Sequence, residues 1–289
     1  MSTLEARKRA ATASLIPPGN KVLSRPPQPG VSPTTLTSVN SESVPSHPIS
    51  NAAKSAELVY RAYAAMADTF AFDADLGLGG KLLYAGELGS PSRDLLLAAN
   101  IAGAASLAAS ADPAAQRLAI REGVVDFSVT SLEEALRILK NEIRKRQPVS
   151  VAVGADPLHL VEQMLDRGVL PDLLPLSVHD SPFIVQGARL IPDSAVDMAE
   201  FVTWSVDREF GRWMPKVDAC ARAVIPAEDH LRQRWLRLAP RYLGRGAQRL
   251  HGVWLSPEET TRFRAAAEEM MQGHSEAAVR VEIRGGLFG

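Results

Sequence analysis

Between residues 82 and 176, short apolar segments alternate with longer segments of helical periodicity, and this alternation restricts the fold more than any other feature. The apolar segments are LLYAGEL (82–88), VVDFSV (124–129), VSVAV (149–153) and PDLLPL (171–176). Few polar residues interrupt them, as expected for strands buried on both faces. Strands and helices joined by short connections are typical of a parallel sheet covered on both sides, and right-handed crossovers make such a sheet doubly wound.

Helix-start signals support this interpretation. Asp112 and Asp156 each precede a proline and are predicted N-caps. Ser131 and Glu134 have capping-box spacing. The segments predicted to be helical are 92–110, which is rich in Ala and Leu, 112–123, 131–146 and 156–168. We therefore predict an α/β fold with a Rossmann-like, mostly parallel sheet over residues 79–190.

The flanking segments have different compositions. Residues 1–51 are rich in Pro and Ser and poor in aromatics, so they are predicted to form a disordered arm, with wrapping around a partner as the alternative. Residues 52–78 are predicted to contain an amphipathic helix, with Leu58 and Phe70 among its regularly spaced apolar side chains. Residues 191–289 are predicted to form a smaller, mostly helical C-terminal subdomain.

Within that subdomain, helices are predicted at 195–215 and 227–239, a strand at 250–255 and a last helix from Ser256. The predicted core anchors there are Trp204, Phe210, Trp213, Trp235 and Leu238.

The bulk composition excludes several classes of protein. The formal net charge is -1, so no overall field favours nucleic acid or an anionic membrane. The basic end of segment 131–146 is expected to be a solvated helix face. No apolar run is long enough for a membrane span, and the single cysteine, Cys220, fits a reducing compartment. These features predict a cytoplasmic protein that binds neither nucleic acid nor membrane.

The chain contains the segments GGKLLYAGELG, LLAANIAGAASL, VVDFSVTSLEEALRILKNEIRKRQPVSVAV and RGVLPDLLPLSVHD. On these segments, residues 80–182 resemble urocanase, the NAD-dependent urocanate hydratase of histidine degradation. Residues 225–256 are similar, more weakly, to a later urocanase segment. The N-terminal part of that family has no visible counterpart here, and the region between the two similar segments is much shorter. The resemblance implies a Rossmann-like domain, and a homodimer or pairing with a full-length urocanase.

The turn after the first strand lacks features that a dinucleotide needs. A diphosphate is normally held by glycine-rich backbone and free N–H groups at a helix N-terminus. In the matching turn only Gly89 occupies a position expected to be glycine, Pro91 removes one donor and Glu87 adds a negative charge. By the resemblance, the residues most suited to a retained cofactor contact are Gly89, Ser90, Ser92, Arg93 and His179.

The other candidate positions have simpler interpretations. The place of the carboxylate that would bind an adenosine ribose is taken by Ser110, and nearby Asp112 is better explained as a helix cap. His179 follows the last strand, where such folds bind ligands, but a surface histidine beside Asp180 is the alternative. The histidines lack zinc-ligand spacing, so no metal is expected. Cys220 has no motif around it.

Three hypotheses follow. The favoured one is a urocanase-related pseudoenzyme with an eroded NAD site, no expected cofactor, and a role in binding a ligand or a partner. The second is a compact urocanate hydratase, a lyase that must retain NAD. The third is an enzyme that uses a mononucleotide at Ser90, Ser92 and Arg93.

Overall fold

The computed structural model describes residues 48–192, 201–206, 208–243 and 250–272. The predicted disordered arm at 1–51 lies outside the described residues except for its last four, which begin the first helix. That helix, α1, spans Pro48–Thr69, so it starts earlier than the predicted 52. None of the helices in the described ranges has both the length and the apolar character that crossing a membrane requires.

A parallel sheet forms the centre of the Rossmann-like domain, as predicted, and all the pairings between its six strands are parallel. The strands lie in the order β3-β4-β2-β1-β5-β6. Their bounds are Leu82–Glu87 (β1), Ala105–Ala109 (β2), Phe127–Val129 (β3), Val149–Val153 (β4), Leu173–Leu174 (β5) and Arg189–Leu190 (β6). The sheet continues by β6 beyond the last predicted strand.

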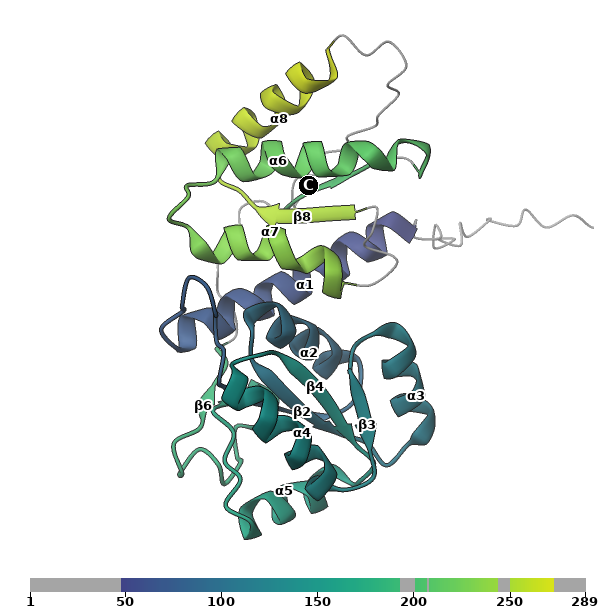
Figure 1. Cartoon of the computed structure of the whole chain (residues 1–289), viewed down its shortest axis with the longest axis vertical. Coiled ribbons are helices and arrows are strands. Elements are labelled where there is room, and N and C mark those ends of the chain that lie inside the picture. Colours follow the sequence, from purple (N-terminus) through teal and green to yellow (C-terminus); the bar gives the residue numbers. More distant parts are fainter. Residues whose placement is uncertain (1–47, 193–200, 207, 244–249, 273–289) are drawn as a thin grey trace, which may run out of the picture. The chain divides into compact units, whose positions relative to one another are not determined.

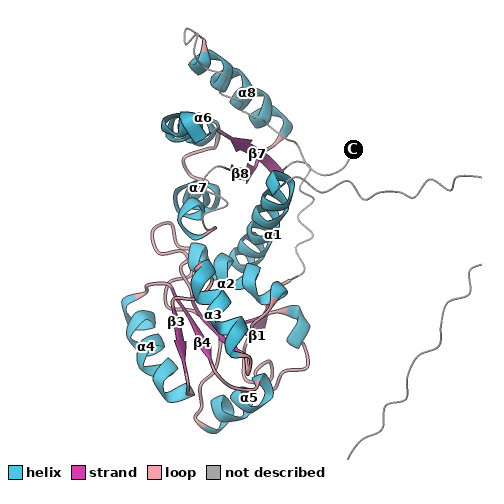
Figure 2. Ribbon diagram, turned by 90° about the vertical axis from the view of Figure 1, so that its right-hand side faces the viewer, coloured by secondary structure: helices cyan, strands magenta, loops and turns pink. Residues whose placement is uncertain are grey.

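The helices cover both faces of this sheet (Figures 1 and 2). Helices α2 (Ser90–Ala102) and α3 (Pro113–Glu122) follow β1 and β2, while the chain moves toward the β3 edge. After β3 the direction along the sheet reverses, and α4 (Leu132–Lys145) and α5 (Pro157–Asp166) pack on the opposite face. Right-handed crossovers require this change of face.

Alternate residues of β1 supply the two cores. Leu83 and Ala85 pack with α1 and α2, whereas Leu82 and Tyr84 pack with the α4 and α5 side. All four are buried, which explains why this strand has no polar alternation. Burial also raises the pKa of Tyr84 to about 12, and its hydroxyl donates to the Pro157 carbonyl oxygen.

Most of the predicted helix starts are confirmed. The carboxylates of Asp112 and Asp156 accept the first-turn N–H groups of α3 and α5. The Ser131 hydroxyl accepts from the Glu134 amide at 3.3 Å, but the Glu134 carboxylate bonds to the Thr130 amide instead of closing a capping box.

The prediction of one helix over 92–110 is wrong. Helix α2 ends at Ala102, Gly103 adopts a left-handed conformation (φ 93), and Ala105–Ala109 forms β2. Alanine favours helices intrinsically, but β2 hydrogen-bonds to both β1 and β4 and all its residues are buried. Tertiary pairing therefore overrides local propensity.

The C-terminal part is mainly helical and contains a small antiparallel sheet. Its elements are β7 (Phe201–Ser205), the 3-10 helix η2 (Arg208–Trp213), α6 (Met214–Val224), α7 (His230–Tyr242), β8 (Leu250–Trp254) and α8 (Pro257–Met271). The predicted helix over 195–215 is wrong where it overlaps β7, and its residues 195–200 lie outside the described ranges. Residues 201–205 instead pair along their whole length with β8, which was predicted as a strand.

The predicted aromatic anchors of this part are buried. Trp204, Trp213 and Trp235 are each at most 5% exposed, and Leu238 packs against the same core. The side chain of Phe210 lies outside what the structure describes.

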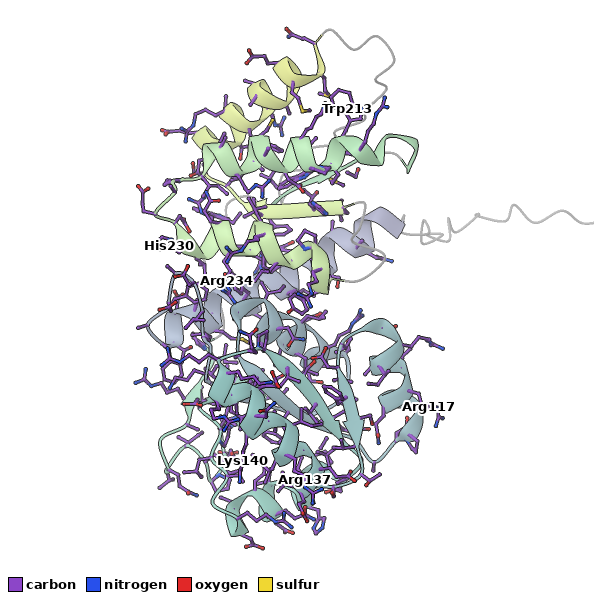
Figure 3. All side chains as sticks on the ribbon, viewed as in Figure 1. Arg117, Arg137, Lys140, Trp213, His230 and Arg234 are labelled. Atoms are coloured by element: carbon purple, nitrogen blue, oxygen red, sulfur yellow. The ribbon has the colours of Figure 1, made fainter. Side chains whose placement is uncertain are left out.

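Direct contacts join α7 to the Rossmann-like domain. Arg234 of α7 lies at the boundary with the Rossmann-like domain (Figure 3). Its guanidinium donates to the carbonyl oxygens of Ile101 (2.9 Å) and Asp75 (2.7 Å). The Tyr63 hydroxyl of α1 donates to the Leu231 carbonyl oxygen at 2.9 Å. Edge-on packing of Tyr60 against Trp235, with ring centroids 4.8 Å apart, adds an apolar contact. Helices α1 and α7 thus share a core with α2.

Candidate functional site

The carboxyl ends of β1 and β5 define the candidate site. The connections after β1 and β5 leave toward opposite faces, and ligands of doubly wound folds bind at such a point. Gly86, near the end of β1, has φ 78, and a Cβ atom there would lie 3.8 Å from a methyl group of Val178. Val178 belongs to the short 3-10 helix η1 (Leu176–Val178). The β1–α2 turn and the segment after β5 therefore lie side by side, as the ligand hypothesis requires.

The β1–α2 turn uses much of its own hydrogen-bonding capacity. Gly89 is the N-cap of α2, and its amide donates to the Ser92 hydroxyl at 2.8 Å. That hydroxyl also donates to the Gly89 carbonyl oxygen at 3.1 Å, and Ser92 is only 2% exposed. Pro91 contributes no N–H group. Among the described residues, no atom outside the immediate chain neighbours lies within 4 Å of a Cβ built on Gly89. The backbone there is therefore open toward these residues, and Ser90 beside it is exposed.

Arg93 pairs within the domain. Its guanidinium lies 3.5 Å from the Glu122 carboxylate of α3, and its Nε is buried without a partner among the described residues. Glu87, which ends β1, is exposed on the same edge. An anion at this turn would meet one carboxylate and an arginine that is already paired.

A side-chain network occupies the end of β2. Gln116 donates to the Ser110 carbonyl oxygen at 2.8 Å and accepts from the Ser128 hydroxyl at 2.6 Å. It also lies against Gly154, where an added Cβ would be 3.3 Å from the Gln116 amide nitrogen. Asp112, the alternative ribose carboxylate, caps α3. Gln116 thus links the ends of three strands, and no sequence pattern predicted this role.

His179 lies on the surface of the candidate edge. Its Nε2 is 3.4 Å from a carboxylate oxygen of Asp180, and the two side chains are 63% and 94% exposed. Its Nδ1 is 3.2 Å from the Leu176 carbonyl oxygen. The structure places His179 on the same sheet edge as the β1–α2 turn, and within the described part of the chain its polar contacts are the local ones to Leu176 and Asp180.

A pocket of about 320 Å³ opens beside this edge, between α1, α2 and the segments after β5 and β6. Its walls are aliphatic side chains and three prolines, and its charged lining residues are Arg61 and Asp94. Leu58 and Leu176 line it while 44% and 47% exposed. Leu58 was predicted to belong to the apolar face of its helix, and the structure instead leaves it on the pocket wall.

Asp94 is the one charged pocket residue that has no partner among the described residues. Burial raises the pKa of its carboxyl, and the nearby charge of Arg93 opposes that shift. Arg61, in contrast, donates from Nε and Nη2 to Glu57. Neither lining residue was predicted, because a charge on a helix usually marks a solvated face and the sequence does not reveal which helices flank it.

Other reactive side chains lie apart from this edge. Cys220 is half-buried on α6, where burial raises the pKa of its thiol. Asp218 accepts from Trp204 Nε1 (2.9 Å) and lies 2.7 Å from His251 Nδ1 within the C-terminal core. Among the described residues, no three His, Cys, Asp or Glu side chains are grouped so as to hold a metal ion.

The parallel doubly wound sheet, whose direction of connection reverses between β1 and β5, defines a Rossmann-like domain. Residues 59–187 match the family model of the urocanase Rossmann-like domain, so the central part of the chain is urocanase-like, as predicted. The matched residues begin within α1 and include η1. The weaker likeness at 225–256 lies outside them and stays a prediction.

Proposed function

We propose that this protein is a non-catalytic relative of urocanase that acts by binding a small ligand at the β1/β5 edge. The observation that carries the proposal is the state of the β1–α2 turn. The Gly89 amide is bonded to Ser92, Pro91 has no N–H, and Arg93 is paired with Glu122. A diphosphate needs donors and positive charge at this position, whereas Glu87 supplies negative charge.

The opposite end of a bound dinucleotide would also lack its partner. An adenosine ribose is normally held by a carboxylate after the second strand. Here Ser110 occupies that position, and its carbonyl oxygen is bonded by Gln116. Because NAD acts as the electrophile in urocanate hydration, weak NAD binding would remove catalysis altogether.

Urocanate hydration is the alternative function. The family match over 59–187 and the open backbone at Gly89 favour it. Its requirement is retention of NAD, so cofactor binding separates the two proposals.

The test is native mass spectrometry of the freshly purified protein, followed by titration with NAD and with AMP. The pseudoenzyme proposal predicts a bare chain, dissociation constants weaker than about 1 mM for both nucleotides, and no loss of the ultraviolet absorbance of urocanate. A retained NAD adduct together with urocanate turnover would refute the proposal and establish the hydratase. Tight AMP binding without NAD binding would support the mononucleotide hypothesis instead.

The cellular location and the association state of the protein belong to the same proposal. A cytoplasmic location fits the composition, and self-association or pairing with a full-length urocanase is what the resemblance implies. Light scattering coupled to size-exclusion chromatography, with and without a full-length urocanase, tests both forms of association. A monomer that does not co-elute with urocanase would exclude them.

A further inference from the structure

The pocket between α1 and α2 combines an apolar wall with a carboxylate that lacks a partner. Leu58 and Ala62 form part of the α1 wall, and Leu95 forms part of the α2 wall. Pro175 closes the side after β5, where the fixed backbone of proline limits movement. Asp94 is half-buried among them and makes no hydrogen bond or ion pair with any described residue.

The charged side chains of this pocket favour a positively charged ligand. The Arg61 guanidinium is 2.6 Å from the Glu57 carboxylate, so its charge is already balanced. Asp94 then leaves the lining with one unbalanced negative charge. A half-buried carboxylate without a partner carries a desolvation cost that a bound cation would offset. The raised pKa of Asp94 agrees with that cost.

The volume of the pocket and the apolar side chains on its walls indicate a small ligand with an apolar body. A volume of about 320 Å³ falls at the lower end of the range for small-molecule sites. Leu58 and Leu176, on walls from different elements, expose large apolar surfaces that a ligand would cover. A fully hydrated ion such as ammonium or Na⁺ would leave these apolar surfaces in contact with water.

From this combination we infer that the pocket binds a small organic cation, an ammonium group on an apolar body, with the ammonium group on Asp94 and the body against Leu58 and Leu176. The inference rests on the proposed binding function of this edge and names the class of ligand. A nucleotide would not be a ligand of this pocket, because its phosphate would be repelled by Asp94.

The experiment compares three probes of one shape and different charge. Phenethylamine, 2-phenylethanol and 3-phenylpropionate are titrated into the full-length protein by calorimetry and by saturation-transfer NMR. The expected result is a dissociation constant of about 1 mM or below for the amine, at least tenfold tighter than for the alcohol, with no measurable binding of the acid. Equal binding of all three probes, or preferred binding of the acid, would overturn the inference.

Two variants and one control variant assign the binding to this pocket. Asp94→Asn keeps the shape of the side chain and should weaken the amine at least fivefold, whereas Asp180→Asn, on an exposed carboxylate of the same edge, should leave it unchanged. Leu58→Ser should weaken the amine several-fold while its preference over the acid remains. Unchanged binding to a folded Asp94→Asn protein would refute the site.

The NAD titration of the same samples tests the proposed function separately, because a protein that binds both NAD and the amine would contradict only the pseudoenzyme proposal.

Discussion

Replacing Arg232 by methionine should destabilise the C-terminal part of the protein by about 3 kcal/mol. Its guanidinium is only 8% exposed and is held by two carboxylates. It lies 2.6 Å from Asp229 through Nε, and its two terminal nitrogens are 2.5 and 3.0 Å from the oxygens of Glu259. The Glu259 side chain is 9% exposed, so methionine would leave a buried carboxylate without its cation.

The magnitude of the destabilisation follows from the hydrogen bonds that each carboxylate retains after the substitution. Removal of one member of a buried ion pair typically costs about 3–5 kcal/mol, because the remaining charge is left unpaired. Glu259 still accepts from the Ser256 amide at 2.9 Å, and Asp229 is 28% exposed and still accepts from the backbone amide of residue 232 at 2.9 Å. These contacts place the cost at the lower end of the range.

Tryptophan fluorescence is the assay, since all four tryptophans lie between residues 204 and 254. With a urea dependence of about 2 kcal/mol per molar, Arg232→Met should lower the unfolding midpoint by about 1.5 M. Arg237→Met, at an exposed position of the same helix, is the matched control and should change stability by less than about 0.5 kcal/mol. The double variant Arg232→Met/Glu259→Leu should regain most of the loss, because the carboxylate that Arg232→Met leaves most deeply buried and unpaired is then removed as well.

The pH dependence gives an independent check. Burial raises the pKa of Glu259, but the hydrogen bonds from Arg232 and Ser256 and the charges of Arg232 and Arg262 together hold it below its ordinary value. A depressed pKa in the folded state means that the pair stabilises fully above the unfolded pKa of about 4.3 and loses this effect as pH falls through the folded value. The difference between wild type and Arg232→Met should therefore be largest near neutral pH and shrink in acid. Equal destabilisation by Arg232→Met and Arg237→Met would refute the argument.

Two further substitutions, each compared with a control substitution, test the Rossmann-like domain. Gly103→Ala should cost about 2 kcal/mol or more, because φ is 93 and the new Cβ would lie 2.4 Å from the Leu76 carbonyl oxygen. Gly168→Ala, where φ is also positive but no atom of another described residue lies within 4 Å, should cost about 1 kcal/mol. Similar thermal shifts for both variants would contradict a steric cause. Asp156→Ala removes the cap that accepts from two amides of α5 and should cost about 1 kcal/mol in urea unfolding. Asp180→Ala, 94% exposed, should cost almost nothing, and an equal effect would rule out capping as the cause.

The candidate site could be predicted only in part. The resemblance places the β1–α2 turn and His179 on one sheet edge, and the packing of Gly86 against Val178 agrees with that placement. The residues that contact the site residues could not be predicted, because they come from distant segments of the sequence. Arg93 is paired with Glu122 on another helix, and the pocket around Asp94 exists only because α1 packs against α2.

The sequence by itself determined the parts of the fold that rest on local chemistry. Apolar runs specify strands such as β4, and an N-cap aspartate specifies the start of α5, because the groups that interact are close in the chain. Only the tertiary structure decided that the alanine-rich β2 is a strand and that residues 201–205 pair with β8. Their hydrogen-bond partners lie far away in sequence, so the free energy of pairing and burial, which local propensity does not contain, selects the conformation.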